Sequence, residues 1–102
     1  MKTVTICGSM RYAEEMKQIA FDLETRHGFN VLQCAYDPQT EEITDVQKQA
    51  LAGAHFKKID LSDAIYVVDI DHYIGESVKK EIAYAQAKGK EVIFHTRFVS
   101  GE

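Results

Sequence analysis

The stretch AIYVVDI at residues 64–70 decides the fold class. It is short, and it is apolar at consecutive positions until Asp69, so both of its faces are expected to be buried. Three further strands are predicted: TVTIC at Thr3–Cys7, FNVLQC at Phe29–Cys34 and EVIFH at Glu91–His95. Strands that are buried on both faces and separated by helices are typical of a parallel sheet covered on each side.

Helical patterns fill the segments between these strands. Apolar residues recur at helical spacing from Arg11 to about His27, and a second helix is predicted from about Glu41 to Leu61. A third helix is predicted within YIGESVKKEIAYAQAKGK, residues 73–90. The second helix carries an apolar face made of Ile43, Val46, Ala50 and Ala54.

Right-handed crossovers leave few ways to arrange four such strands, and the order 2-1-3-4 is the simplest. We therefore predict an α/β fold, a single-domain Rossmann/flavodoxin-like three-layer sandwich with a parallel four-stranded sheet that spans residues 1–102. In this order strands two and three lie on opposite sides of strand one, so the chain leaves strands one and three in opposite directions. The loops after those two strands then leave a crevice in which open α/β sheets bind ligands.

The composition limits the function. The 102 residues, 45% hydrophobic and 27% charged, fit one small domain, and a domain of this size makes a homo-oligomer plausible. A net charge of −4 argues against binding to a nucleic-acid polymer but not against a local phosphate pocket. With no signal peptide or membrane-spanning run and with two cysteines, we expect a reduced, cytoplasmic protein with no metal and no cofactor.

The loop after the first strand reads Gly8-Ser9-Met10-Arg11. Gly8 would allow a sharp turn or a close approach of the backbone to a ligand, and Ser9 would present its hydroxyl and amide at a helix N-terminus. Arg11 offers a planar fork that suits a phosphate or a carboxylate. The alternative is that Ser9 is an ordinary helix cap and Arg11 a solvated surface residue.

The second group of candidates follows the third strand and consists of Asp69, Asp71, Tyr73, Gly75, Ser77 and Glu81. Glu81 borders the apolar stripe through Val78 and Ala85, near the first turn of its helix, where the helix dipole favours an ionised carboxylate. Such a carboxylate suits a nucleophile for an electron-poor sugar carbon. The alternative is an ion pair between Glu81 and Lys80 or Lys88.

Three other side chains could assist at this crevice. Asp69 could act as a second acid or could merely cap a turn. Tyr73 could stack on a base or could belong to the rim of the core. His55, on the second helix, could be catalytic or orient a ligand, although many helical histidines only pack or cap.

Three segments together resemble the nucleoside 2-deoxyribosyltransferase-like superfamily, including its branch of 2′-deoxynucleoside 5′-phosphate N-hydrolases. CGSMR at residues 7–11 resembles the phosphate loop of that branch, and LSDAIYVVDID at 61–71 resembles the family's third strand. SVKKEIAYAQAKGKEVIF at 77–94 resembles its pattern of a glutamate, a helix with small residues, G-K and a strand. The resemblance spans nearly the whole chain.

The resemblance implies cleavage or transfer at the N-glycosidic bond of a nucleoside or nucleotide. Glu81 would be the nucleophile that attacks C1′ of a deoxyribose, and Ser9, Arg11 and Ser77 would hold a 5′-phosphate. Members of the superfamily often complete the site with a neighbouring subunit, so a homodimer or higher homo-oligomer is the implied assembly.

One departure from the family pattern keeps other functions open. Family members usually carry an aspartate in the helix before the third strand, whereas this chain has His55 at roughly that place and Asp60 out of register on the helix. A non-catalytic module that binds or senses a nucleotide is therefore the main alternative. A small scaffold that takes no ligand is a third hypothesis, and it rests only on size and the alternating pattern.

Overall fold

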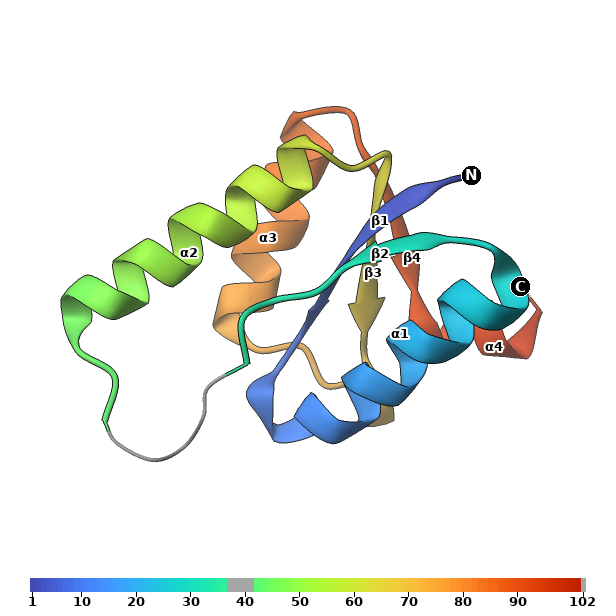
Figure 1. Ribbon diagram of the computed structural model, residues 1–102, viewed down its shortest axis with the longest axis horizontal. Coiled ribbons are helices and arrows are strands. Elements are labelled where there is room, and N and C mark those ends of the chain that lie inside the picture. The colour runs from blue at the N-terminus through green and yellow to red at the C-terminus, as the bar shows by residue number, and fades with distance from the viewer. Residues whose placement is uncertain (37–41, 102) are drawn as a thin grey trace.

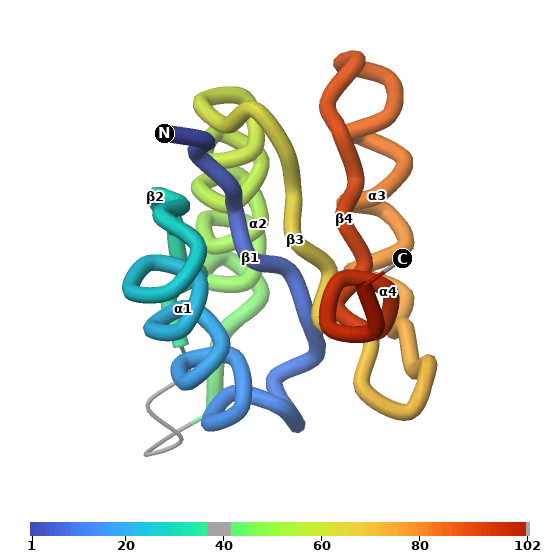
Figure 2. The backbone as a smooth tube through the Cα atoms, turned by 90° about the vertical axis from the view of Figure 1, so that its right-hand side faces the viewer, coloured from blue at the N-terminus to red at the C-terminus, as the bar shows by residue number. Residues whose placement is uncertain are grey.

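The computed structural model describes residues 1–36 and 42–101, and its four strands form one parallel sheet (Figure 1). The central strands β1 (Thr3–Gly8) and β3 (Ala64–Val68) pair with each other. The edge strand β2 (Asn30–Leu32) pairs with β1, and the other edge strand β4 (Glu91–Phe94) pairs with β3. The order β2-β1-β3-β4 confirms the predicted fold class, and Figure 2 shows the strands side by side in this order.

Helices cover both faces of the sheet and complete three layers. α1 (Ala13–His27) and the short α4 (His95–Ser100) pack on one face, and α2 (Asp45–Asp60) and α3 (Glu76–Ala87) pack on the other. All five residues of β3 are buried, as expected for a strand that is apolar on both sides.

Alternation along β1 divides the core between the two helix layers. Val4 and Ile6 face α1, while Thr5 and Cys7 face α2 and α3. The polar side chain of Thr5 and the thiol of Cys7 are therefore packed against α2 and α3.

The second strand is shorter than predicted. FNVLQC is predicted as a strand throughout, but pairing with β1 ends at Leu32. Cys34 and Ala35 instead line a cavity beside the sheet.

The second helix differs from the prediction in its start and in its buried face. The expected start at Glu41 lies outside the described residues, and α2 begins at Asp45, after a capping box formed by Thr44 and Gln47. Val46, on the expected apolar face, is 75% exposed, whereas the buried residues of α2 are His55 and Ile59. Figure 1 shows the reason, since the N-terminal half of α2 extends beyond the sheet and packs on no strand.

A fourth helix was not predicted, and it includes a residue assigned to the last strand. His95 begins α4, and its Nδ1 lies 2.6 Å from the hydroxyl of the buried Tyr66. Burial raises the pKa of Tyr66, so the phenol stays protonated and can donate a hydrogen bond to Nδ1 of a neutral His95. Burial also lowers the pKa of His95 from 6.5, although the charge of Asp69 acts in the opposite direction.

This pair predicts a loss of stability in mild acid. Because the folded protein has the lower pKa, the unfolded chain binds more protons at His95 as the pH falls below about 6.5, and the free energy of unfolding decreases. Chemical denaturation at pH 8 and pH 5 should show a larger loss for the wild type than for His95→Asn, whose side-chain oxygen also accepts a hydrogen bond. His72→Asn, at an exposed histidine, is the control and should keep the wild-type loss. Equal losses in the wild type and His95→Asn would contradict this account.

Candidate functional site

The loops that follow β1 and β3 meet at the carboxyl edge of the sheet. The guanidinium of Arg11 lies 4.0 Å from the centre of the Tyr73 ring, and the rings of Tyr12 and Tyr73 meet edge to face. The Tyr12 hydroxyl also donates a long hydrogen bond of 3.4 Å to the carbonyl of Ile70. These contacts join the two loops at the place where the strand order locates the crevice.

A cavity of about 620 Å³ opens beside these loops, between the end of β1, α2 and the first turns of α3. This volume is typical of a small-molecule site. The predicted site residues that line it are Gly8, Ser9, Met10, His55, Tyr73, Gly75, Ser77 and Glu81. Arg11, Asp69 and Asp71, which the structure also describes, do not border it.

The first loop is shaped by its own packing. Ser9 caps a single turn of 3₁₀ helix, because its Oγ accepts a hydrogen bond of 3.3 Å from the amide of Arg11. A Cβ atom on Gly8 would lie 2.5 Å from Sδ of Met16 and 3.2 Å from Cβ of Val68. A side chain at position 8 would therefore have to displace Met16 of α1, and the next residue, Ser9, lines the cavity.

The N-terminus of α3 is the feature of the cavity best suited to an anion. α3 has twelve residues, and Gly75 at its start provides no capping side chain. The amides of the first helical turn have no acceptor within the helix, and together with the helix dipole they attract negative charge. Three lysines, of which the sequence singled out only Lys80 (as an ion-pair partner of Glu81), add positive charge to the same walls. These are Lys48, Lys58 and Lys80.

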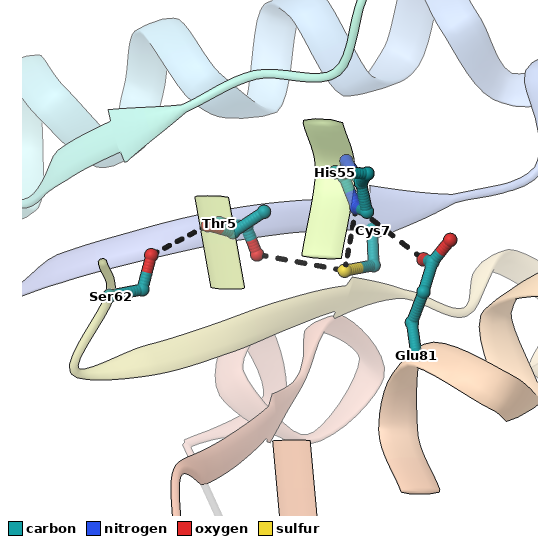
Figure 3. Close-up of polar contacts among 5 residues, drawn as sticks. All are labelled: Thr5, Cys7, His55, Ser62 and Glu81. Carbon is teal, nitrogen blue, oxygen red and sulfur yellow. Dashed lines mark hydrogen bonds and ion pairs between the residues drawn. The ribbon is translucent and has the colours of Figure 1, made fainter. Parts of the chain in front are cut away.

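Glu81 turns towards the sheet, where it joins two buried side chains. Figure 3 shows Cys7 of β1, His55 of α2 and Glu81 of α3 with their polar ends directed at one another. His55 Nε2 lies 3.3 Å from Cys7 Sγ and 3.5 Å from Glu81 Oε1. Within the described residues, His55 is the only ion-pair partner of Glu81, so the alternative pairing with Lys80 or Lys88 does not occur. Glu81 is the sixth residue of α3, one turn further from the N-terminus than predicted.

Cys7 is buried in the apolar core near the end of β1, and its thiol also has a polar partner there in His55. Burial raises the pKa of its thiol well above the usual value, and the charge of Glu81 raises that pKa further. The thiol is therefore neutral at neutral pH and is not an activated nucleophile. No sequence motif could show this contact, because Cys7 and His55 are 48 positions apart.

A second polar chain beside this cluster is fully paired (Figure 3). Ser62 Oγ donates to the carbonyl of Lys58 at 2.8 Å and lies 2.6 Å from Oγ1 of Thr5, which then donates to it. In contrast, Nδ1 of His55 is buried and has no hydrogen-bond partner among the described residues. The residue that carries the unsatisfied atom, His55, is also one of the residues that line the cavity.

Asp69 holds the start of α4 instead of lining the cavity. Its two carboxylate oxygens accept hydrogen bonds from Thr96, one from the amide at 2.9 Å and one from the hydroxyl at 2.8 Å. Asp71 and His72 follow in left-handed conformations, with φ of 55° and 60°. Such conformations are uncommon in residues other than glycine, although aspartate and histidine adopt them more readily than most. The turn thus leads the chain from Asp69 towards Tyr73.

Comparisons with protein-family models, with curated proteins and with solved structures find no match for this chain. The resemblance to the nucleoside 2-deoxyribosyltransferase-like superfamily therefore stays a prediction from the three quoted segments. In residues 1–36 and 42–101, no helix combines the length and apolar character needed to span a membrane.

The contacts of Asp69 predict a structural cost of removing it. Asp69→Ala leaves the part-buried amide of Thr96 without its acceptor and should lower the free energy of unfolding by about 1–3 kcal/mol. Thr96→Val removes only the hydroxyl bond and should cost less. Denaturant unfolding of both variants and of the double variant measures the coupling between the two side chains. Additive losses, with no coupling, would contradict this role for Asp69.

Proposed function

We propose that the protein cleaves or transfers at the N-glycosidic bond of a 2′-deoxynucleoside or its 5′-monophosphate, with Glu81 as the nucleophile. One observation supports this best: the Glu81 carboxylate borders the same cavity as Ser9, Ser77 and the N-terminus of α3. An anion-binding end and a carboxylate thus face one ligand-sized space. The three segments that resemble the deoxyribosyltransferase-like superfamily supply the reaction class.

The proposed reaction has two steps. A carboxylate oxygen of Glu81 attacks C1′ while the bond from C1′ to the base nitrogen breaks, and the base leaves with that electron pair and takes up a proton. The sugar is then held as an ester on Glu81. Water releases it in a hydrolase, and the nitrogen of a second base takes it in a transferase.

His55 acts in this proposal through the nucleophile. A proton on Nε2 would be donated to Oε1 of Glu81 across the observed 3.5 Å. This contact holds the carboxylate in one orientation and leaves Oε2 free to meet the sugar. Orientation of this kind contributes to catalysis because it reduces the entropy that must be lost in the transition state.

The other end of the cavity would hold the phosphate. The Ser9 and Ser77 hydroxyls and the first amides of α3 supply hydrogen-bond donors, and the lysines of the cavity wall supply charge. Arg11 is already stacked on Tyr73, so we assign it to the rim, where it positions that ring for contact with the base. A second copy of the chain is the partner we propose for completing the base-binding side, as the resemblance implies.

A second candidate function is nucleotide binding without turnover, and the position of Asp69 favours it. With Asp69 bound to Thr96, the other carboxylate at the described cavity walls besides Glu81 is that of Glu76. Glu76 pairs with Lys79 at 3.2 Å, and its side chain is 86% exposed. A second acid that could protonate the leaving base is therefore not held beside Glu81. Tight nucleotide binding with no release of base would select this function.

Release of free base tests the proposed reaction. Purified protein is incubated with each of the four 2′-deoxynucleosides and their 5′-monophosphates, and free base is measured by chromatography. At least one substrate should yield base, and Glu81→Gln, which preserves side-chain shape but not charge, should slow its release by at least about 10³-fold. Glu14→Gln is the matched control, because Glu14 lies on α1 at the opposite face and its side chain is 85% exposed.

Two results would contradict the proposal. One is the absence of base release from every substrate, and the other is an equal rate in the wild type and Glu81→Gln. The first result combined with measurable binding of a monophosphate by calorimetry would leave nucleotide binding without turnover as the function.

A further inference from the structure

We propose that Cys7, His55 and Glu81 form an exchangeable binding site for Zn²⁺ at the inner wall of the cavity. The three potential ligand atoms are Cys7 Sγ, His55 Nε2 and a carboxylate oxygen of Glu81, and they all lie within 4.8 Å of one another. They come from β1, α2 and α3, so the packing of three separate elements brings them together (Figure 3).

The distances within the cluster match those between ligands of one metal ion. For metal–ligand bonds of about 2.0–2.3 Å, two ligands of a tetrahedral Zn²⁺ lie about 3.3–3.6 Å apart. His55 Nε2 lies 3.3 Å from Cys7 Sγ and 3.5 Å from Glu81 Oε1. The remaining distance, between Cys7 Sγ and the Glu81 carboxylate, would be shortened to this range by a rotation of the Glu81 side chain. That side chain is 17% exposed and borders the cavity.

Within the described part of the chain, hydrogen bonds leave one of the three side chains, that of His55, unsatisfied, whereas the Cys7 thiol has a second acceptor in the carbonyl of Thr5 at 3.9 Å. Nε2 of His55 cannot both accept a proton from the thiol and donate one to the carboxylate, so in either tautomer one of the two contacts lacks a hydrogen bond. His55 is 8% exposed, and its Nδ1 has no partner among the described residues. Buried polar groups are costly when they are not paired, so three polar ends that converge within 4.8 Å of one another form an arrangement that a bound cation would stabilise.

A cation satisfies the three converging atoms together. On binding, the Cys7 thiol releases its proton to solvent, and the thiolate, the Nε2 lone pair and the carboxylate each donate an electron pair to the ion. A set of sulfur, imidazole nitrogen and carboxylate oxygen suits Zn²⁺ rather than Mg²⁺ or Ca²⁺, which prefer oxygen ligands. The proton of His55 then resides on Nδ1.

Two features make this site exchangeable rather than structural. Three protein ligands leave a fourth position that opens to the cavity, as in zinc sites that bind water or substrate. A metal-bound histidine usually donates a hydrogen bond from its other ring nitrogen to a carboxylate or carbonyl. Loss of that acceptor weakens metal binding by about 10–100-fold. Nδ1 of His55 has no such acceptor among the described residues.

Occupancy by Zn²⁺ would also control the reaction, and this part of the inference rests on the proposed function. Coordination to Zn²⁺ withdraws negative charge from the carboxylate with which Glu81 attacks C1′ and so makes it a weaker nucleophile. Zn²⁺ should therefore inhibit release of base, and a chelator should restore it. The same residues would then serve either as nucleophile and positioning residue or as metal ligands.

Titration of the reduced, metal-free protein with Co²⁺ tests the site without reference to activity. We expect a near-ultraviolet charge-transfer band from a thiolate–cobalt bond and visible bands of a four-coordinate ion, and Zn²⁺ should remove both because it binds the same ligands more tightly. Cys7→Ser should abolish the charge-transfer band. Glu81→Gln should weaken Zn²⁺ binding more than about tenfold. Losing a metal ligand costs at least as much affinity as losing a residue that only hydrogen-bonds to a ligand.

Cys34→Ser is the matched control, because Cys34 is the second free cysteine and also lines the cavity. It should keep the band and the affinity. Circular dichroism confirms folding of each variant, and if Cys7→Ser fails to fold, His55→Gln and Glu81→Gln decide the question by their Zn²⁺ affinities. A wild type without the charge-transfer band, a band lost in Cys34→Ser but not in Cys7→Ser, or unchanged Zn²⁺ affinity in both Glu81→Gln and His55→Gln would overturn the site.

The metal site and the proposed reaction fail separately. A cobalt band in a metal-free protein that releases no base keeps the site and removes the reaction. Base release that is unaffected by saturating Zn²⁺, in a protein that shows the band, overturns control by the metal while keeping both the site and the reaction.

Discussion

The parallel pairing of β1 with β3 is the constraint on which the site depends. It joins two strands separated by two helices and another strand, from Val4 opposite Ala64 to Gly8 opposite Val68. With β2 outside β1 and β4 outside β3, the chain leaves these central strands in opposite directions. Their carboxyl ends therefore open onto one crevice, and the loops that follow them meet there through Arg11, Tyr12 and Tyr73.

The same pairing turns one face of β1 towards α2 and α3, and the polar side chains of that face differ in how well they are satisfied. Thr5 belongs to a hydrogen-bond chain that ends on a backbone carbonyl of α2, which stabilises the packing of that helix. Two residues further, Cys7 meets His55 and Glu81 in a cluster that hydrogen bonds do not complete. Because unsatisfied buried groups are destabilising, their position at a cavity wall is better explained by ligand binding or catalysis than by stability.

The sequence predicted the sheet because β3 and most of β1 are apolar on both faces, a pattern that has few other solutions. It also predicted that Glu81, Ser9 and Tyr73 share a cavity, since strand order alone places their loops. It failed for the exposed half of α2, where helical periodicity at Val46 was interpreted as a buried face although no strand lies beneath it. It could not show that Asp69 is bound by Thr96 or that Cys7 contacts His55, since both contacts form only through tertiary packing.

The most direct test of the central claim is a crystal structure of the Glu81→Gln variant with a 2′-deoxynucleoside 5′-monophosphate. The account predicts that C1′ lies about 3–3.5 Å from the side-chain amide at position 81. It also predicts that the phosphate contacts Ser77 and the first amides of α3. A nucleotide bound elsewhere, or one whose sugar faces away from position 81, would contradict the account.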